Sequence, residues 1–246
     1  MCTYLNYSMF LTTKKLAVKF ASAVQYRSYY KMLLVCEVFA ALTVKCIYGF
    51  FARLKVRNGE YLHLIDPPYL IVANHANYND PFIIGAASFF KQKKLLPYCF
   101  MTLPKFLEWP IRGKLIRLVG SFPVFPKAGS LDESLEVAIR ILKERRGSII
   151  MFPEGKRNAQ HHHQNARPGI AHLMKKFPDI PVVPMFISGN QPIPPLSFFF
   201  GRMKLMVTIG KPFTCRDIEG EKKDNIVLAR EVMQRIMELE KNGLVV

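Results

Sequence analysis

Short runs of apolar, β-branched and aromatic residues alternate with helical segments through most of this 246-residue chain. Several of these runs are apolar at every position, unlike a strand that has one face in water. Continuous apolar runs are typical of strands that are covered on both faces, as in α/β sheets. The predicted strands are Tyr69–Ala73, Tyr98–Thr102, Ser121–Phe125, Ser148–Phe152, Val182–Ile187 and Lys204–Ile209. The pattern predicts an α/β fold in which helices flank a central, mostly parallel or mixed sheet.

Helix signals separate these strands. Ser130 followed by Glu133 forms a capping box, and apolar residues then recur at helical spacing, so we predict a helix over 130–146. Pro81 opens another predicted helix, with Asp80 at its N-cap position. The carboxyl-terminal segment 225–241 has one apolar face and is predicted to form a third helix.

The composition limits the class of protein and its partners. Half of the residues are hydrophobic and 22% are charged, which excludes a disordered chain and a bundle of membrane-spanning helices. The net charge of +17 indicates a polyanionic partner, which is nucleic acid, an anionic bilayer or a phosphorylated substrate. The five cysteines include no C-x-x-C pair, and no secretory signal is recognised, so we expect reduced thiols inside the cell.

The amino-terminal segment combines positive charge with apolar side chains. Residues 1–57 carry nine basic side chains and the single acid Glu37. Glu37 and Lys45 interrupt the apolar run, and the remaining pieces are shorter than the roughly 18–20 residues that a span requires. We therefore expect 1–56 to be a basic amphipathic helical segment that lies on the bilayer, monotopic rather than spanning, before a domain over 57–246. An ordinary helical hairpin packed on a soluble core is the alternative.

The first candidate for chemistry lies where a predicted strand ends and a helix begins. The sequence contains no G-x-S-x-G elbow, phosphate-binding loop or H-E-x-x-H helix, which removes the enzyme classes that depend on them. His75 follows the strand and Asp80 starts the helix, at the edge where open α/β sheets place their sites. Such a pair can activate a substrate hydroxyl, with the carboxylate orienting the imidazole. Alternatively, Asp80 only caps its helix and His75 is an ordinary loop residue.

A second cluster follows the predicted strand Ser148–Phe152. It places the carboxylate of Glu154, the flexible Gly155 and the two cations Lys156 and Arg157 in one short loop. Arginine offers a planar fork suited to phosphate, and glycine allows the backbone to approach a ligand closely. A solvated charged turn is the alternative for this loop taken alone.

Together the two clusters resemble the glycerolipid acyltransferases of the lysophosphatidic acid (1-acylglycerol-3-phosphate) acyltransferase type. The resemblance is carried by His-x-x-x-x-Asp at 75–80 and by Phe-Pro-Glu-Gly-x-Arg at 152–157. Gly120–Val124 and Val183–Ile187 resemble the family's weaker second and fourth motifs, in the same order. The likeness covers about residues 57–212.

The resemblance implies a fold, a reaction and residue roles. The family has a mixed α/β domain with an acyl-accommodating groove. His75 would be the general base on the free hydroxyl of lysophosphatidic acid, and Asp80 would orient its ring. The acyl group would come directly from acyl-CoA or acyl carrier protein, without an acyl-enzyme or a bound cofactor, to give phosphatidic acid. Glu154, Gly155 and Arg157 match the motif that binds the acceptor.

Two departures from the family pattern leave the acceptor open. Lys156 stands where the family often has Thr or Ser, and it adds a cation that suits a phosphate oxygen or a different headgroup. Pro126 replaces the arginine of the middle motif, and we expect Lys127 to bind phosphate in its place, with a solvated surface lysine as the alternative.

Other signals in the sequence are weaker. We expect no metal site at His161–His163, because three adjacent imidazoles cannot all face one ion. Phe198–Phe200 suits either contact with lipid or packing under a loop. Basic residues surround Trp109, which suits nucleic acid, pantetheine phosphate or a bilayer; they are Lys105, Arg112, Lys114 and Arg117.

The sequence thus favours a membrane-associated acyltransferase on the cytoplasmic face. Its partners would be a phospholipid membrane, lysophosphatidic acid and acyl-CoA or acyl carrier protein, with no nucleic acid expected. Acylation of another lysophospholipid or hydroxyl acceptor is the closest alternative. A non-catalytic basic protein that binds membranes or nucleic acid is a more remote one.

Overall fold

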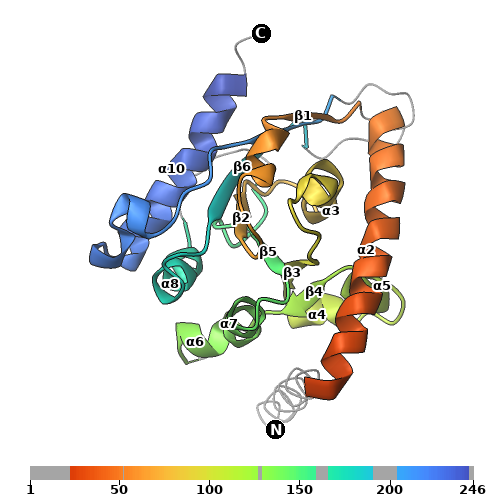
Figure 1. The fold of residues 1–246 in the computed structure, drawn as a ribbon, viewed down its shortest axis with the longest axis horizontal. Coiled ribbons are helices and arrows are strands. Elements are labelled where there is room, and N and C mark those ends of the chain that lie inside the picture. Colours follow the sequence, from red (N-terminus) through yellow and green to blue (C-terminus); the bar gives the residue numbers. More distant parts are fainter. Residues whose placement is uncertain (1–22, 52, 127–128, 159–165, 191–203, 244–246) are drawn as a thin grey trace, which may run out of the picture.

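The chain folds around one mixed sheet. The computed structural model describes residues 23–51, 53–126, 129–158, 166–190 and 204–243 (Figure 1). Within them, seven strands form a sheet in the order β1-β7-β6-β2-β5-β3-β4. The strands are β1 (Lys55–Arg57), β2 (Leu70–Ala73), β3 (Tyr98–Thr102), β4 (Ser121–Pro123), β5 (Ser148–Met151), β6 (Val182–Ser188) and β7 (Met206–Ile209). Of the neighbouring pairs, β6 and β7 are antiparallel and the others are parallel. The expected α/β fold with a mixed sheet is confirmed.

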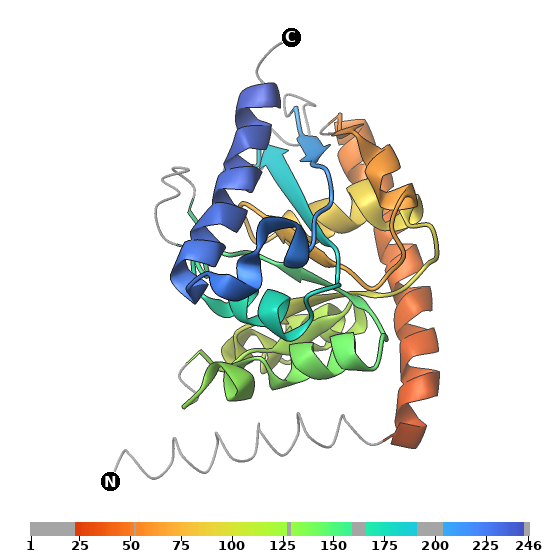
Figure 2. The same cartoon turned by 60° about the vertical axis from the view of Figure 1, so that its left-hand side comes forward.

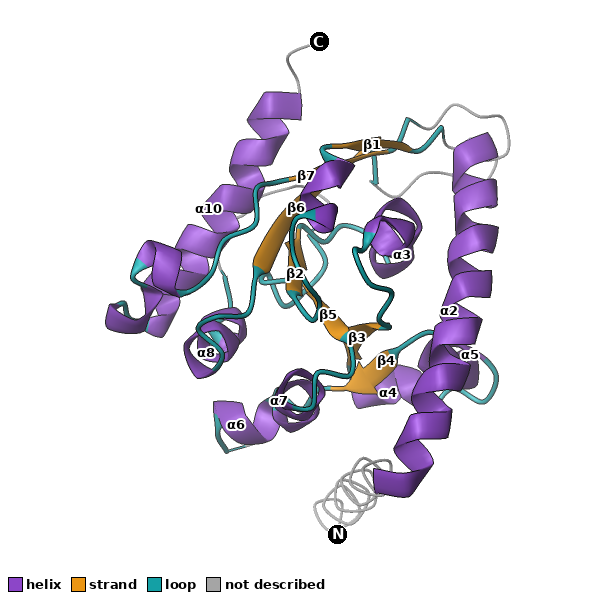
Figure 3. Cartoon of the chain, viewed as in Figure 1, coloured by secondary structure: helices purple, strands orange, loops and turns teal. Residues whose placement is uncertain are grey.

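Helices cover both faces of this sheet (Figure 3). One face carries α7 (Glu136–Lys143), α8 (Gly169–Lys176) and α10 (Asn225–Gly243), and the other carries α2 (Ala23–Phe51) and α3 (Asp80–Ser88). The side chains of β2 alternate between the two resulting cores: Leu70 and Val72 lie in one, and Ile71 and Ala73 lie in the other. Burial on both faces is the physical reason for the unbroken apolar runs in the sequence.

The structure corrects one sequence prediction about secondary structure and adds one strand. The predicted helix over 130–146 is two helices, α6 (Leu131–Ser134) and α7, because the backbone leaves the helical conformation at Leu135, which is buried in the core. The cap is present, since the Ser130 hydroxyl accepts a hydrogen bond from the Glu133 amide at 3.2 Å. The edge strand β1 was not predicted, because three residues with two cations carry no strand signal.

Within the amino-terminal segment, residues 23–51 form one continuous helix, and Lys55 and Val56 already belong to β1. In α2, Leu33, Glu37 and Ala41 face the domain and are buried, which matches the i, i+4 spacing of one helix face. The exposed side carries large apolar residues, which are Met32, Val35, Phe39, Leu42, Ile47 and Phe50. Figure 2 shows α2 along one edge of the molecule.

The sequence predicted that Glu37 and Lys45 interrupt the apolar run of α2, but in the structure both side chains have partners in the domain. The Glu37 carboxylate turns inward and accepts a hydrogen bond from the Tyr98 amide at 2.7 Å, and the Lys45 ammonium lies 5.8 Å from the ring centre of Phe90. The stretch Lys31–Phe50 is long and apolar enough to cross a membrane, by length and composition alone. A helix that is buried on one side and apolar on the other fits a monotopic membrane association.

Candidate active site

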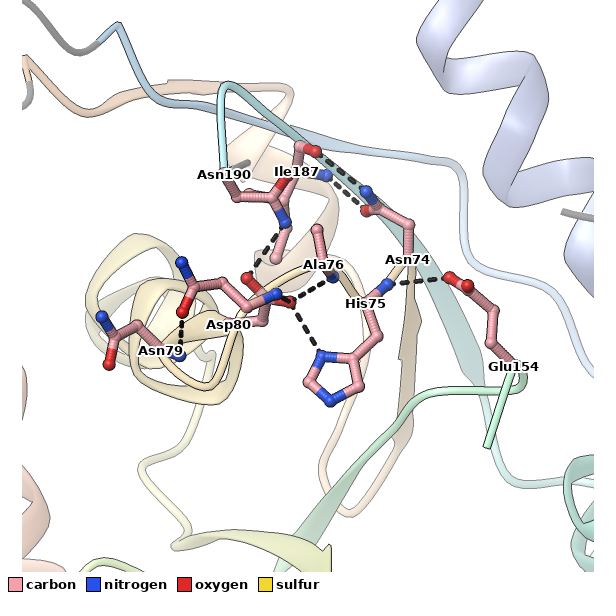
Figure 4. Close-up of polar contacts among 9 residues, drawn as sticks. Asn74, His75, Ala76, Asn79, Asp80, Glu154, Ile187 and Asn190 are labelled. Atoms are coloured by element: carbon pink, nitrogen blue, oxygen red, sulfur yellow. Dashed lines mark hydrogen bonds and ion pairs between the residues drawn. The ribbon is translucent and has the colours of Figure 1, made fainter. Parts of the chain in front are cut away.

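His75 and Asp80 form a close pair at the carboxyl end of β2. The loop after Ala73 brings the Nδ1 atom of His75 to 2.8 Å from the Oδ2 atom of Asp80 (Figure 4). The Asp80 side chain is fully buried, whereas 19% of the His75 side chain is exposed. The imidazole can thus meet a substrate while its partner stays away from water.

Asp80 is held by the backbone of the same loop. Its Oδ2 atom also accepts hydrogen bonds from the amides of Ala76 and Asn77, at 2.7 and 2.8 Å. The expectation that Asp80 is the N-cap is wrong: Asn79 occupies that position, and the Asp80 carboxylate points to the loop instead. Three donors to one oxygen fix the position of the carboxylate.

The second predicted cluster lies against the first. β5 leads into Phe152, whose ring stacks on the His75 imidazole with 4.1 Å between ring centres. The Glu154 Oε1 atom accepts a hydrogen bond from the His75 amide at 2.8 Å. The Asn158 amide donates to the His75 carbonyl at 2.7 Å. The two loops, 79 residues apart in sequence at His75 and Glu154, therefore form one site.

Glu154 lies inside this site rather than on its surface. Burial raises the pKa of its carboxyl to about 7, although hydrogen bonds from the His75 amide and the Asn158 side chain oppose the shift. The carboxyl therefore titrates near neutral pH, at the point where it contacts the backbone of the candidate base.

The next three residues place two cations at the surface beside His75. Gly155 has a positive φ of 66°, and a Cβ atom there would lie 2.6 Å from the Arg167 side chain, so the turn requires glycine. Lys156 and Arg157 follow and are exposed. The Arg157 guanidinium carbon lies 3.5 Å from the ring centre of Tyr78, which belongs to the His75 loop.

Several residues of interest lie outside the described part of the chain. They are Lys127, His161–His163 and Phe198–Phe200. Among the residues that the structure does describe, there is no group of three or more His, Cys, Asp and Glu side chains that could hold a metal ion.

Two asparagines complete the site, and the sequence did not predict their roles. The Asn74 side chain pairs with both backbone groups of Ile187 in β6, at 2.9 and 2.7 Å. The buried Asn190, just after β6, donates from Nδ2 to the Oδ1 atom of Asp80 at 3.0 Å. Gly189 makes the intervening turn with a φ of 77°. A Gly-Asn pair after an apolar strand is a turn signal in the sequence. The residue that Asn190 binds, Asp80, lies 110 residues earlier, and the sequence does not show that contact.

An apolar recess adjoins the site. It lies between α2 and α3, is open to solvent and has a cavity volume of about 40 Å³. Pro81 and Phe82, directly after Asp80, form part of its wall, and Ala41 and Val44 of α2 form another part. The only carboxylate on the wall is Glu37.

Comparison with known proteins identifies the family. The family model described as "Acyltransferase" matches residues 53–188, which is more than half of the chain and includes both loops of the site. The chain belongs to the acyltransferase family. The family resemblance of the two motifs is thereby confirmed, and the His75 and Glu154 loops lie within the acyltransferase domain.

Two curated relatives and one solved structure agree with this membership. The 1-acyl-sn-glycerol-3-phosphate acyltransferase of Streptococcus pneumoniae is 26% identical over 185 residues, which cover 75% of this chain and 65% of that protein. The protein of the same name from Saccharomyces cerevisiae is 25% identical over 189 residues, covering 74% and 60%. The chain thus spans less than two thirds of either relative.

The crystal structure of the 1-acyl-sn-glycerophosphate (LPA) acyltransferase PlsC from Thermotoga maritima shares the fold. It superposes with a TM-score of 0.63 over 96% of this chain and 89% of that one, at 20% sequence identity. At this level of identity, the likeness establishes the common architecture of the acyltransferase domain.

Proposed function

We propose that this protein transfers a fatty acyl group to the free hydroxyl of lysophosphatidic acid and so makes phosphatidic acid. The observation that carries the proposal is the 2.8 Å contact between His75 Nδ1 and the buried Asp80 carboxylate, in a loop that belongs to an acyltransferase domain. The names of the two curated relatives support this acceptor. The donor would be acyl-CoA or acyl carrier protein.

The geometry supports general-base catalysis by His75. In the tautomer that keeps its proton on Nδ1 and donates a hydrogen bond to Asp80, Nε2 carries the lone pair that would accept the proton of the acceptor hydroxyl. The hydroxyl oxygen then attacks the carbonyl carbon of the thioester, and the carbon–sulfur bond breaks. The imidazolium returns the proton to the departing thiolate, while Asp80 stabilises its charge. The acyl group passes directly between substrates, without an acyl-enzyme.

The exposed cations of the second loop would bind the acceptor's phosphate. Arg157 offers two parallel donors, and its contact with Tyr78 keeps it beside the His75 loop. Lys156, and Lys127 from the middle motif, would add further charge. Gly155 sets the turn that presents these cations. We assign Glu154 to holding the two loops together, because its carboxylate already accepts from the His75 amide.

The acyl chain would lie along the apolar residues that line the recess between α2 and α3, beginning at Pro81. The exposed apolar side of α2 would rest in the bilayer from which the acceptor enters, on the cytoplasmic face. Acylation of a different lysophospholipid is the second candidate, and the exposed Lys156 favours it because a second cation can pair with another headgroup.

One assay tests the proposed reaction. The purified full chain is given radiolabelled acyl-CoA with lysophosphatidic acid or another lysophospholipid, and the product is identified by mass spectrometry. His75→Ala should lower the rate by about 10²–10⁴-fold, because it removes the general base. Wild-type protein that is inactive with every donor and acceptor, or a His75→Ala variant with full turnover, would refute the proposal.

The chain offers a matched control for this variant. His172 also lies 2.8 Å from an aspartate, Asp132, but it belongs to α8 rather than to either loop of the site, and the Asp132 side chain is 57% exposed rather than buried. His172→Ala should therefore retain wild-type turnover, which separates loss of the catalytic base from loss of any His–Asp pair.

A further inference from the structure

A second apolar surface lies beside α2, on a short helical hairpin. α4 (Pro104–Leu107) and α5 (Arg112–Leu118) connect β3 to β4. Their outer side exposes five large apolar residues that no core contains: Leu103, Trp109, Ile111, Leu115 and Leu118. Of these, Ile111 is 72% exposed and Leu115 is 57% exposed. We name these five residues the hairpin patch.

Close contacts hold α4 and α5 against each other. The exposed side chains therefore stand on a backbone with a defined conformation. α5 approaches the end of α4 so closely that a Cβ atom on Gly113 would lie 2.3 Å from the Leu107 carbonyl oxygen. The Arg117 guanidinium donates to the same oxygen at 3.0 Å. The Trp109 ring packs edge-to-face on Phe106, with 5.2 Å between ring centres.

Cations frame the hairpin patch. Lys105, Arg112 and Lys114 are exposed around it, and Glu108 is the one acid between Leu103 and Leu118. The charged ends of Lys105 and Arg112 lie 5.1 and 5.8 Å from the ring centres of Phe106 and Trp109. Aromatic and aliphatic side chains bordered by Lys and Arg match the boundary between acyl chains and anionic headgroups. Binding to nucleic acid would explain the cations but not the exposed Ile111 and Leu115.

The hairpin patch lies close to the candidate site. α4 follows β3, whose carboxyl end lies at the same edge of the sheet as those of β2 and β5. Tyr78 of the His75 loop contacts Phe106 of α4, with 5.9 Å between ring centres, and it also contacts Arg157. α5 contacts α2 (Figure 1), so the hairpin patch lies next to the helix with the exposed apolar side.

We propose that the hairpin patch docks on an anionic phospholipid bilayer as a second membrane contact beside α2. Its place next to Tyr78 and Arg157 then sets the site at the depth of the lipid headgroups. The docking surface itself stands on the geometry of the hairpin, and its benefit to catalysis rests on the proposed function. A lysolipid could then reach His75 without leaving the bilayer.

The chain carries its own probe of this contact, because Trp109 is its single tryptophan. The full chain is mixed with vesicles of phosphatidylcholine alone or of phosphatidylcholine with phosphatidylglycerol, and binding is followed by sedimentation and by Trp109 emission. We expect a blue shift with the anionic vesicles, and quenching when their acyl chains are brominated near the headgroup. Protein that sediments with vesicles while the Trp109 emission stays unchanged would overturn the proposal, since α2 would then bind alone.

Paired variants separate the patch from general surface effects. Ile111→Glu with Leu115→Glu adds two acids at exposed positions and should weaken vesicle binding by about tenfold or more. Ile226→Glu with Val227→Glu makes the same change at similarly exposed positions of α10, and it should bind as the wild type does. Equal affinity of the hairpin variant and the wild type would contradict the proposal. So would an emission shift of the same size with coenzyme A or duplex RNA in place of vesicles.

A further assay distinguishes failure of the docking proposal from failure of the proposed acyltransferase activity. On a short-chain lysolipid kept monomeric, the Ile111→Glu and Leu115→Glu variant should match the wild-type rate, and its rate should fall only with vesicle-borne acceptor. If neither protein acylates any acceptor, the proposed function fails, while Trp109 emission and sedimentation still decide the docking surface.

Discussion

At the scale of single residues, the candidate site depends on how Asp80 is held. Its two oxygens receive hydrogen bonds from the His75 ring, two loop amides and the Asn190 side chain. A buried carboxylate with several donors is fixed in position. The orientation of the His75 ring therefore depends on groups that contact Asp80 rather than the ring itself.

Asn190→Ala tests this dependence. We expect kcat to fall by about tenfold to a hundredfold with little change in the acceptor's KM, because a buried carboxylate oxygen loses its donor. Asn190→Asp should be slower still at neutral pH, because it sets a second carboxylate against Asp80. Steady-state kinetics of both variants, with thermal unfolding as the control for folding, measure these effects. An unchanged kcat, or a rise in KM alone, would contradict the role.

Arg157→Ala tests the phosphate contact. The acceptor's KM should rise by about tenfold or more, because a charge-assisted pair of hydrogen bonds is lost, while the KM of the acyl donor stays unchanged. Arg157→Lys should restore part of the affinity. Tyr78→Phe keeps the ring under the guanidinium and serves as the control. Equal KM values for the wild type and Arg157→Ala would place the phosphate elsewhere.

The sequence predicted the charged residues of the site better than its amides. His75, Asp80, Glu154 and Arg157 stand in short, recognisable motifs, and the structure brings their two loops together. Asn190 carries no such motif, since an amide beside a glycine is typical of many turns. Its contact with Asp80 exists only after β6 is laid beside β2.

At the scale of elements, Glu37 shows why the sequence alone misjudged α2. A carboxylate in an apolar run was predicted to interrupt it, but helical geometry turns this side chain toward the sheet, where the Tyr98 amide binds it. Gly120 makes room for it, because a Cβ atom there would lie 2.8 Å from Glu37 Oε1. The sequence does not show which side of a helix meets the domain until the neighbouring elements are placed.

Glu37→Gln should change how stability depends on pH. Burial raises the pKa of the Glu37 carboxyl well above its ordinary value of 4.5, although the bond from Tyr98 lowers it in part. The folded chain thus holds this proton more tightly than the unfolded chain. The resulting stabilisation is complete below pH 4.5 and is lost as the pH rises through the raised pKa.

The glutamine does not titrate, so the variant should gain stability relative to the wild type as the pH rises, by at most about 1.4 kcal/mol per pH unit. Urea unfolding at a series of pH values gives both free energies of unfolding. Glu154, whose pKa is raised in the same direction, is present in both proteins and cancels in the difference. If the free energies of unfolding of the two proteins change with pH in parallel, the pKa of Glu37 is the same in the folded and unfolded chains.

At the scale of the whole molecule, the candidate site and the exposed apolar surface belong to different parts of the chain. The domain holds the site at the carboxyl ends of β2 and β5, and α2 offers an apolar surface along one edge (Figure 2). The α/β class followed from the apolar runs. The strand order did not, because pairing β1 with β7 depends on contacts between opposite ends of the chain.

Phe39→Glu with Phe50→Glu tests the membrane role of α2. Both side chains are more than two-thirds exposed, at 67% and 79%, so the double variant should fold with an unchanged Tm. Its share in the membrane fraction should fall severalfold, because two large apolar groups become charged. Detergent-free fractionation and thermal unfolding measure the two properties. Full retention in the membrane fraction would assign binding to another surface.

The pairing of β1 with β7 also orders events during synthesis. Lys55 pairs with Met206, about 150 residues later, so the ribosome needs roughly 8–30 s at 5–20 residues per second to deliver the partner strand. The nascent α2 leaves the exit tunnel long before its inner side, with Leu33 and Glu37, has a sheet to cover it. Its apolar side can therefore reach a lipid surface first, and the catalytic domain would then assemble on a chain that is already tethered.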